Sequence, residues 1–364
     1  MNLKNLQLKI YKEFNPEIEK IWENFEKNSN NYFFQTLNWQ KEWFYSIIKH
    51  NNNYSINIIV VKNNEDILFI LPFCIKKIFI FKILMWAGYP FSDYNAPLIK
   101  KDLELNREDF LYIWKKIIQI IKFNINCVDL QNQPEKIKDM ANPFFDYLST
   151  KVKYNYHSLI LKNFTNINKS QISDIKYQQK RLNSKGSLLF KFVKNSEEQK
   201  KVLNFIIKNK VIQYQSTNAW NIFQNLGNKF FFLNGNLNLR QNLSISYISD
   251  DEEIIAAHLG YVYMGTFYYL FPAYNLKYKK YSPGKILLNF LVNYCRLNGI
   301  NCFDFTIGSE TYKKNWSNYQ QKGSITLHSL NIIGDIYTFY FKLKNKIKSF
   351  NQIKFFKKIY NRIK

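Results

Sequence analysis

The segment from residue 281 to residue 316 constrains the fold more than any other part of the chain. It starts with Ser-Pro-Gly at 282–284, where Ser is a favoured N-cap residue and Pro suits the first helical position. Apolar residues then recur at helical spacing as far as Gly299, a typical helix stop. The run 302–305 is typical of a buried strand, and a polar stretch begins at Gly308. The segment therefore predicts a helix, a strand and a loop in succession.

The start of this helix predicts an anion-binding site. The first turn of a helix carries free backbone N–H groups and about half a positive charge. A glycine in that turn lets a ligand approach the backbone closely. We expect the anion to contact Ser282, Gly284, Lys285 and the nearby Lys280. The alternative is a well-capped core helix followed by a surface loop.

The composition fits a folded globular protein with a strong positive charge. At 364 residues, with 46% hydrophobic and 18% aromatic residues, the chain is long enough for two domains with separate cores. The formal net charge of +25 comes almost entirely from lysine, because only five residues are arginine. Base reading and bidentate phosphate contacts favour arginine. We therefore expect no specific DNA binding, but a general attraction for anionic ligands or an anionic membrane.

Cysteines, histidines and hydropathy exclude several classes of protein. The four cysteines lie in apolar surroundings without a Cys-x-x-Cys pair, and the four histidines show no metal-ligand spacing. The N-terminus lacks the pattern of a secretory signal. The most apolar run, 67–75, is too short to span a bilayer. We expect a cytoplasmic protein without a metal, with peripheral contact with the inner membrane face left open.

Strand and helix patterns alternate along the chain and predict an α+β (mixed α/β) fold of two similar halves. Each half is expected to be a mixed sheet flanked by helices. The expected boundaries are 1–157 and 158–335, followed by a basic amphipathic helix at 336–364. The expected helices are 16–26, a second helix around Trp39 and Trp43, 107–123, 175–182, 196–208 and 283–298. The expected strands are 57–61, 67–72, 84–87, 126–130, 158–161, 190–193, 245–247, 254–263, 267–273, 302–305 and 325–331.

The segment 341–364 contains nine basic residues and no acidic one. Its apolar residues fall on one face of a helix. A basic amphipathic helix of this kind can lie on an anionic membrane. The alternatives are a terminal helix docked on the protein itself and a solvated tail.

The order of short motifs along the chain resembles one known family. The early and middle motifs are Phe34-Gln35, Trp39, Trp43, Leu71-Pro72, Ser92-Asp93-Tyr94 with Pro97, and Arg181-Leu182 with Gly186. The late motifs are Ala256-Ala257-His258-Leu259-Gly260, Tyr268-Tyr269, Ala273-Tyr274, Ser282-Pro283-Gly284, Phe303-Asp304-Phe305, Gly308, Glu310, Tyr312-Lys313 and Trp316. Over about residues 30–320 the chain resembles the CelD/BcsL-like acetyltransferase family of the GNAT superfamily, which is related to the FemAB aminoacyl transferases.

The resemblance implies two tandem GNAT-like domains that transfer an acyl group from acetyl-CoA or another acyl-CoA to an amine or hydroxyl. It also implies an acceptor from cell-envelope or exopolysaccharide biosynthesis, such as a nucleotide- or lipid-linked sugar. The segment 278–285 corresponds to the Gly-rich pyrophosphate loop of GNAT enzymes, but it contains only one Gly. Fewer backbone amides can then close on the phosphates, and Lys279, Lys280 and Lys285 would compensate through their charge.

Acyl transfer needs a general base and a stabilised oxyanion. We expect the base to be Glu310, Asp304 or His258, in that order, and the oxyanion to receive a backbone N–H from the strand 267–273. Lys313 resembles the lysine that FemAB-like enzymes place on the transferring group, where it would stabilise the negative charge that develops there. Asp304 alternates with two phenylalanines, so its pKa should rise if that face of the strand is buried. Each candidate also has a structural alternative. Asp304 could cap a loop amide, Glu310 and Lys313 could be solvated surface charges, and His258 could be a core histidine.

The acceptor is expected to lie between the domains. The residues expected to contact it are Gln35, Trp39, Asp93, Tyr94, Arg181, Tyr274, Tyr312 and Trp316. Packing explains the tryptophans equally well, and Arg181 suits either a phosphate of the acceptor or a solvated helix face.

Two other functions stay open. One is FemAB-like transfer from aminoacyl-tRNA to a peptidoglycan precursor, which the basic surface would suit. FemAB enzymes often carry an inserted coiled-coil arm, and the sequence has no heptad run. The other is a non-catalytic scaffold at the membrane surface.

Overall fold

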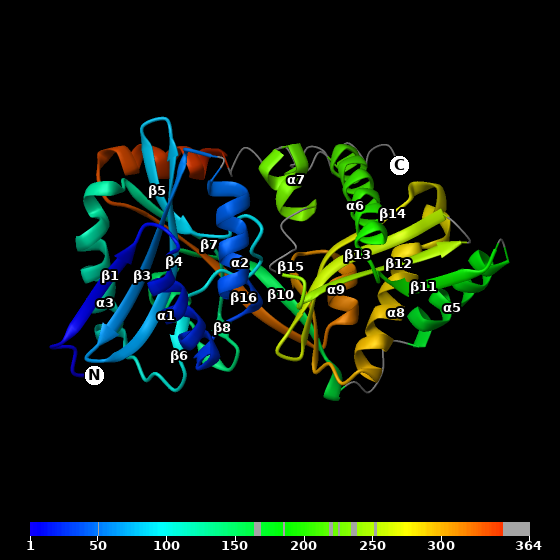
Figure 1. Cartoon of the computed structure of the whole chain (residues 1–364), viewed down its shortest axis with the longest axis horizontal. Helices are drawn as coiled ribbons and strands as arrows, with labels where there is room; N and C mark the ends of the chain where they lie inside the picture. The colour runs from blue at the N-terminus through cyan, green and yellow to red at the C-terminus, as the bar shows by residue number, and fades with distance from the viewer. Residues whose placement is uncertain are drawn as a thin grey trace.

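The chain folds into two lobes that lie side by side (Figure 1). The computed structural model describes residues 1–49, 51–163, 169–184, 186–217, 221–224, 226–233, 239–250 and 253–344. In Figure 1 the first lobe holds the blue and cyan segments, and the second holds the yellow segments and most of the green ones.

The two lobes repeat one order of elements. The first contains β1 (Leu6–Tyr11), α1 (Pro16–Lys27), α2 (Leu37–Trp43), β3 (Tyr54–Asn63), β4 (Asp66–Ile78), β5 (Phe81–Trp86), α3 (Arg107–Ile121) and β7 (Cys127–Pro134). The second contains β11 (Leu188–Phe192), α6 (Ser196–Thr217), α7 (Leu226–Leu233), β12 (Leu243–Asp250), β13 (Glu253–Tyr263), β14 (Thr266–Tyr274), α8 (Pro283–Leu297) and β15 (Cys302–Ile307). In each lobe three antiparallel strands are followed by a helix and a parallel strand. The predicted α+β fold of two similar halves is confirmed.

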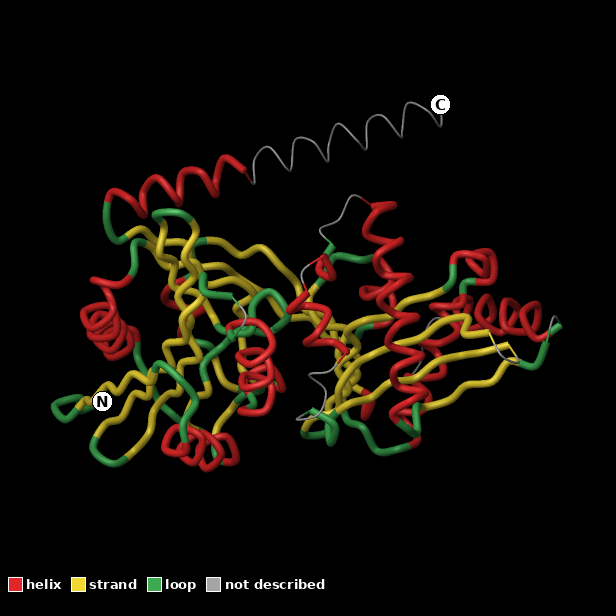
Figure 2. The backbone as a smooth tube through the Cα atoms, turned by 45° about the horizontal axis from the view of Figure 1, so that its top comes forward, coloured by secondary structure: helices red, strands yellow, loops and turns green. Residues whose placement is uncertain are grey.

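Shorter elements complete the described chain. They are the strands β2 (Ser29–Asn30), β6 (Leu98–Lys100), β8 (Lys136–Ile137) and β9 (Met140–Ala141), the helices α4 (Pro143–Leu148), α5 (Lys169–Asn183) and α9 (Thr311–Trp316), the 3-10 turns η1 (Phe33–Gln35), η3 (Lys122–Asn124), η4 (Leu161–Asn163), η5 (Ile222–Gln224) and η7 (Leu276–Tyr281), and the π-helical turn η2 (Phe44–Ile48). A last helix covers residues 332–344 and lies across the first lobe (Figure 2).

One continuous sheet runs through both lobes, in the order β1-β3-β4-β5-β7-β16-β10-β15-β14-β13-β12-β11, with β2 and β6 attached beside β4. At its centre the lobes exchange strands. β10 (Lys151–Ile160) follows the first lobe in sequence but pairs with β15, and β16 (Tyr319–Ser329) follows the second lobe but pairs with β7. β10 and β16 also pair with each other. The exchanged strands link the two lobes through backbone hydrogen bonds. The expected division after residue 157 falls within β10, and the domain boundary stays a prediction.

The segment that the sequence singled out forms α8, β15 and α9. Buried side chains at Ile286, Leu287, Leu291 and Cys295 form the stripe of α8 that packs in the core of the second lobe. Burying one such aliphatic side chain contributes about 1.5–3 kcal/mol, so the stripe fixes α8 on the sheet.

Two elements differ from their predicted limits. The stretch after Gly308 was expected to be a loop, but α9 forms there because Trp316 packs into the core of the second lobe. A helix of six residues is too short for periodicity to reveal. The last strand is Tyr319–Ser329 rather than 325–331, because the final helix already starts at residue 332. Most of the predicted tail, 345–364, lies outside the described residues.

Candidate active site

Two consecutive residues of the first lobe reach across to the second. Asp93 and Tyr94 lie in the connection after β5. The Tyr94 hydroxyl lies 3.0 Å and 2.9 Å from the two carboxylate oxygens of Asp304 on β15. The Thr306 hydroxyl, two residues further along β15, donates a hydrogen bond to the Asp93 carboxylate. The end of β15 is therefore the place where polar groups of both lobes meet.

Aromatic rings hold Tyr94 in this position. Its ring stacks between Tyr32 and Tyr156, with ring centroids 4.2 Å away on each side. The Gln35 side chain donates to the Tyr94 carbonyl oxygen at 2.7 Å. Neither the ring nor the backbone of Tyr94 can move without breaking these contacts, so the hydroxyl is aimed at β15 before any substrate binds.

The residues behind this connection are buried. The Trp39 indole N–H donates to the Ser92 hydroxyl at 2.9 Å. Gln35, Trp39 and Tyr94 expose at most 1% of their surface. All three were predicted to contact the acceptor. Because their polar atoms bond within the first lobe or to Asp304, we interpret them as residues that position the connection rather than as walls of a cleft.

Asp304 is a buried carboxylate with both oxygens close to donors. Besides the Tyr94 hydroxyl, it accepts a hydrogen bond from the Thr306 backbone N–H at 2.7 Å. Burial raises the pKa of Asp304 to about 7. The Thr306 backbone is left-handed, with φ 60°, which is rare for a β-branched residue and tends to occur at functional sites.

Asp93 is the more accessible of the two acids. It is half-buried, and burial raises its pKa to about 6, while the Thr306 hydrogen bond and the Lys313 charge act in the opposite direction. A carboxyl group with this pKa is mostly ionised at neutral pH and can still accept a proton during a reaction.

Lys313 brings a buried positive charge to the same place. Its ammonium group, on α9, donates to the Ile307 carbonyl oxygen at 2.6 Å and lies 3.4 Å from a carboxylate oxygen of Glu310. The Lys313 side chain is only 7% exposed, whereas that of Glu310 is 56% exposed. Gly308 makes this arrangement possible, because a side chain there would collide with both Glu310 and Lys313. The structure thus brings together Asp93, Glu310 and Lys313 of the predicted set.

Sequence reasoning missed a second buried lysine. Lys210 of α6 is buried and donates to the Gln213 side-chain oxygen at 3.1 Å. Burial lowers the pKa of Lys210 to about 8, and the charges of Glu310 and Lys313 are close enough to contribute. One signal was available: Lys210 continues the four-residue spacing of Val202 and Ile206, both of which are buried. A lysine on the apolar stripe of a helix is a reason to look for a partner.

Two histidines, His258 and His157, lie deeper in the fold. His258, a predicted base, is fully buried on β13, and its ring stacks on Tyr269 with centroids 4.4 Å apart. Neither of its ring nitrogens has a hydrogen-bond partner in the described structure, and burial lowers its pKa to about 3. These contacts favour a core role. His157 on β10 is also buried, 3.4 Å from the Ser317 hydroxyl, and burial lowers its pKa.

The start of α8 offers fewer free amides than the sequence suggested. Pro283 has no N–H, and the N–H groups of Lys285 and Ile286 donate to the Ser282 carbonyl at 2.9 Å and 3.3 Å. In the described structure, the N–H of Gly284 remains without such a partner. A side chain at Gly284 would meet only Tyr274, at an ordinary 3.7 Å, so the backbone is open to approach there.

Helix α5 lies beside this turn. Lys285 forms an ion pair with Asp174 of α5 at 3.1 Å. Arg181 of α5 lies over the Tyr281 ring, 5.2 Å from its centroid, and Lys280 lies over the same ring at 5.3 Å. Arg181 is therefore stacked next to the predicted cofactor loop rather than between the lobes.

The remaining predicted substrate residues belong to the second lobe. Trp316 is buried in its core, and the half-buried Tyr312 packs edge-on against Phe305 with centroids 6.2 Å apart. Tyr274 is half-buried at the end of β14, next to Gly284. Of these three, Tyr274 is the one that borders the predicted cofactor loop.

β14 and β15 separate after a short parallel contact. They pair only from Thr266–Cys302 to Tyr268–Asp304, although β14 continues to Tyr274. The β15-facing backbone groups of 269–274 are therefore not bonded to β15. These unpaired residues belong largely to the strand 267–273, which the sequence predicted to supply a backbone donor for the oxyanion.

Two surface cavities border α6 on the second lobe. One, of about 710 Å³, is lined by α6, β11 and β12 and includes Lys201 and Tyr247. The other, of about 390 Å³, shares Lys201 and reaches Asn275, the residue before η7. None of the predicted site residues lines either cavity.

Metal clusters and membrane-spanning helices are both absent from the part of the chain that the structure describes. No group of three or more His, Cys, Asp or Glu side chains is placed to hold a metal ion there. No helix in the described ranges has the length and apolar character needed to cross a membrane.

The comparison with known families decides the class of the second lobe. Residues 169–314 match the family described as the acetyltransferase (GNAT) domain. This part of the chain is therefore similar to a GNAT acetyltransferase domain. It includes α6, the start of α8, the end of β15 and Lys313, so the site described above lies largely within it. No curated protein matches the sequence.

Solved structures show the same fold over most of the chain. FemX is 10% identical, with a TM-score of 0.62 over 89% of this chain and 98% of FemX. L-PGS from Bacillus licheniformis is 13% identical, with a TM-score of 0.51 over 91% and 98%. A tandem GNAT protein from the clavulanic acid biosynthesis pathway is 8% identical, with a TM-score of 0.51 over 90% and 99%. At these identities the likeness shows the fold alone, which is a tandem GNAT fold.

Proposed function

We propose that the protein transfers an acyl group from acyl-CoA, bound to the second lobe, to an amine or hydroxyl of an acceptor held between the lobes. The observation that carries this proposal is the buried Lys313 ammonium at the end of β15, with Glu310 at 3.4 Å. It is near enough to the Asp93 carboxylate of the first lobe to affect its pKa. A buried cation with acids from two lobes suits a reaction in which negative charge develops on a carbonyl oxygen.

In the proposed reaction, the Asp93 carboxylate takes the proton from the acceptor N–H or O–H. The acceptor nitrogen or oxygen forms a bond to the thioester carbonyl carbon, and the Lys313 ammonium stabilises the resulting oxyanion. The carbon–sulfur bond then breaks, the carbonyl re-forms, and coenzyme A leaves as its thiolate. Asp93 suits the base because its pKa of about 6 is close to neutral pH. Glu310, the first base that the sequence predicted, is the alternative.

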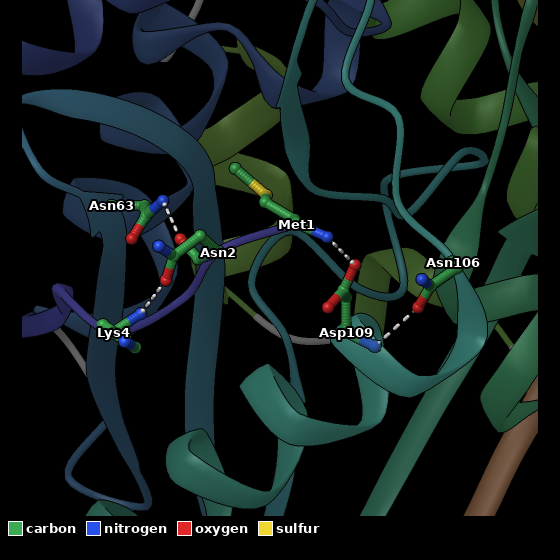
Figure 3. Close-up of polar contacts among 6 residues, drawn as sticks. All are labelled: Met1, Asn2, Lys4, Asn63, Asn106 and Asp109. Carbon is green, nitrogen blue, oxygen red and sulfur yellow. Dashed lines mark hydrogen bonds and ion pairs between the residues drawn. The ribbon is translucent and has the colours of Figure 1, made fainter.

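The helices α3 and α8 hold equivalent positions in the two lobes, and the difference between their first turns supports a donor site in the second lobe. At the start of α3 in the first lobe, the Asn106 side chain caps the Asp109 N–H, and the Met1 ammonium bonds to the Asp109 carboxylate (Figure 3). Acidic residues therefore occupy that helix end and oppose an anion. At the start of α8, Ser282 makes no side-chain cap and no acid lies in the first turn, and the Lys285 ammonium there is paired with Asp174 of α5. A phosphate is favoured at the second helix.

The acceptor that we propose is a sugar precursor of the cell envelope or an exopolysaccharide, linked to a nucleotide or a lipid. The support is the ordered set of motifs that resembles the CelD/BcsL-like family, together with the matching GNAT domain. The basic surface would attract the phosphates of such a precursor. Lys210 and Lys313 would both face its anionic groups.

A transfer assay tests this function. The full-length protein is incubated with radiolabelled acetyl-CoA and a panel of nucleotide-linked amino sugars, and the label is followed into the sugar. We expect transfer that depends on Lys313, with Lys314→Ala as a matched control because Lys314 is exposed on the same helix. Absence of transfer to every sugar, together with absence of acetyl-CoA binding, would reject acyl-CoA as the donor.

One observation favours a second candidate, FemAB-like transfer from aminoacyl-tRNA to a peptidoglycan precursor. The first turn of α8 leaves a single N–H, that of Gly284, for a pyrophosphate, whereas the surrounding lysines suit a nucleic-acid backbone. The same centre would perform the chemistry, because an aminoacyl ester needs the same base and oxyanion donor.

Thermal shift separates the candidates. A ligand at a hundredfold excess over its dissociation constant stabilises the protein by about 2.7 kcal/mol. Stabilisation by acetyl-CoA supports the first candidate, and stabilisation by aminoacyl-tRNA alone supports the second. No stabilisation by either leaves the membrane scaffold as the remaining function.

A further inference from the structure

The first lobe carries a group of exposed apolar side chains that packing does not explain. We call it the apolar edge, and it has two parts, the turn between β4 and β5 and the outer face of the helix 332–344. Its members are Phe79, Ile80, Ile332, Ile336, Phe339, Tyr340 and Leu343, all exposed. Phe79 is 88% exposed. We propose that the apolar edge inserts into the surface of an anionic lipid bilayer. This inference is independent of the proposed acyl transfer.

The two parts of the apolar edge are physically joined. The inner face of the last helix packs on the β4–β5 hairpin, with the rings of Tyr337 and Phe81 5.6 Å apart. Ile78 and Phe341 pack in the same small cluster. Figure 1 and Figure 2 both show the β4–β5 turn next to this helix at the edge of the lobe. The exposed turn and the exposed helix face therefore move as one unit.

The turn itself is unusual for its position. Ile78 pairs with Phe81, so Phe79 and Ile80 are the two central residues of a two-residue hairpin. Phe79 has φ 52°, in the left-handed region that favours Gly or Asn in such turns. A phenylalanine there is unfavourable for folding and exposes its ring to water. A partner that buries the ring would offset both costs.

The charges around the apolar edge favour lipid over protein. Lys77 and Lys82 flank the turn, and Lys342 and Lys344 lie on the helix; all four are exposed. The one acid on the helix, Asp335, bonds to the Ser329 hydroxyl at 2.5 Å. In the sequence, residues 341–364 contain nine basic residues, Lys342 and Lys344 among them, and no acid. An apolar face with a basic rim is the pattern that binds anionic membrane surfaces.

A second copy of this chain fits the apolar edge less well. Two such edges would bring basic rims of the same sign together, and like charges oppose association. An anionic bilayer neutralises these lysines and takes up the apolar side chains at once. The lipid surface is therefore the occupant that we propose.

Liposome flotation of the full-length protein tests the inference. Vesicles contain either phosphatidylcholine alone or phosphatidylcholine with phosphatidylglycerol. The main variant replaces the turn, Phe79→Asn with Ile80→Gly, because Asn-Gly is the favoured two-residue hairpin and should not unfold the protein. A second variant, Ile336→Glu with Phe339→Glu, changes the helix face. The matched control is Leu297→Glu, an exposed apolar residue at the end of α8 in the second lobe.

We expect the protein to float with the anionic vesicles and to do so at least tenfold less in both edge variants, with the control unchanged. Raising the salt concentration should also weaken flotation. Flotation that is unaffected in both variants would overturn the inference, because binding would then reside elsewhere. Flotation with neither vesicle would also overturn it, as would a dimer in sedimentation that the turn variant abolishes.

Discussion

The two lobes carry the same strand with the same acid, and they differ in the chain segment that follows this strand. Residues 127–129 of β7 read Cys-Val-Asp, and residues 302–304 of β15 read Cys-Phe-Asp. Each carboxylate is buried and lies near a tyrosine hydroxyl from a distant part of the chain: Asp129 near Tyr337, at 3.0 Å, and Asp304 near Tyr94. Both strands also contain a left-handed residue after the acid, Asn132 or Thr306. We therefore interpret the aspartate and its tyrosine as parts of the scaffold in both lobes, and the role of Asp304 as a base stays a prediction.

The two lobes differ in the chain segment that leaves this strand. In the first lobe, β7 continues into the small hairpin of β8 and β9. In the second, Gly308 turns the chain into α9, and Lys313 enters the centre. The helices differ as well, because α3 starts with acids and α8 starts with a lysine. In the proposed function, the second lobe therefore supplies Lys313 and the donor site, while the first supplies Asp93.

The largest effect is expected at the acid that only the first lobe supplies. Asp93→Asn should lower turnover about 10²–10⁴-fold, because the acceptor loses its general base. In the wild type the rate should fall as the pH drops through about 6, where Asp93 becomes protonated. The measurement is a pH–rate profile of acyl transfer.

Asp129→Asn is the control for this prediction, since Asp129 lies outside the proposed centre. Its turnover should match that of the wild type. If Asp93→Asn stays active and Glu310→Gln does not, the base is Glu310 and the role of the first lobe is structural.

Lys313→Met should lower turnover about 10²–10³-fold, as expected for the loss of one oxyanion donor. Methionine keeps the apolar stem, so the melting temperature should change little. The neighbouring Lys314→Met should be neutral. Equal losses of activity and stability in Lys313→Met would make Lys313 a structural residue.

The two buried aspartates should make the same kind of contribution to stability. Burial raises the pKa of both Asp304 and Asp129, so the folded protein binds their protons more tightly than the unfolded chain does. Both groups should therefore lose stability as the pH rises, and the loss from Asp304 should extend from about pH 4 to about pH 7. Asp304→Asn should remove about 1–3 kcal/mol of this pH dependence, since one unit of pKa corresponds to about 1.4 kcal/mol. Denaturant unfolding at pH 5 and pH 8 measures it. A variant with the wild-type pH dependence would contradict the assignment.

Lys210→Met should lower turnover about tenfold and remove the alkaline limb of the pH–rate profile, which is the fall of the rate at high pH. The Lys210 ammonium is present below its pKa of about 8 and is lost above it, so the wild-type rate should fall as the pH rises through about 8. Lys208→Met, on the exposed side of the same helix, should keep the wild-type profile. An unchanged alkaline limb in Lys210→Met would remove this lysine from the centre.

The smallest effect is expected at the helix ends. Lys285→Gln should raise the KM for the donor about two- to fivefold, because a charge at a helix terminus contributes about 0.3–1 kcal/mol. Glu108→Gln, in the first turn of α3, should leave that KM unchanged. A larger effect of Glu108→Gln would indicate a donor in the first lobe.

Much of the fold was accessible from the sequence, because α8 begins at a proline and ends shortly before Gly299, and both α8 and β15 have clear apolar patterns. The exchange of β10 and β16 was not, since pairing between distant strands leaves no local pattern. Asp93, Glu310 and Lys313, which the structure brings together, were predicted from motifs, with Asp93 as an acceptor contact rather than as a base. Lys210 was missed because α6 is rich in lysine, and only its position on the buried stripe distinguishes it.

Hydrogen–deuterium exchange with and without donor tests the central claim most directly. We expect acetyl-CoA, or aminoacyl-tRNA if that is the donor, to protect 274–287 and 306–313 of the second lobe and to leave 100–109, at the start of α3, unchanged. Protection at 100–109 instead would contradict the claim that the second lobe holds the donor.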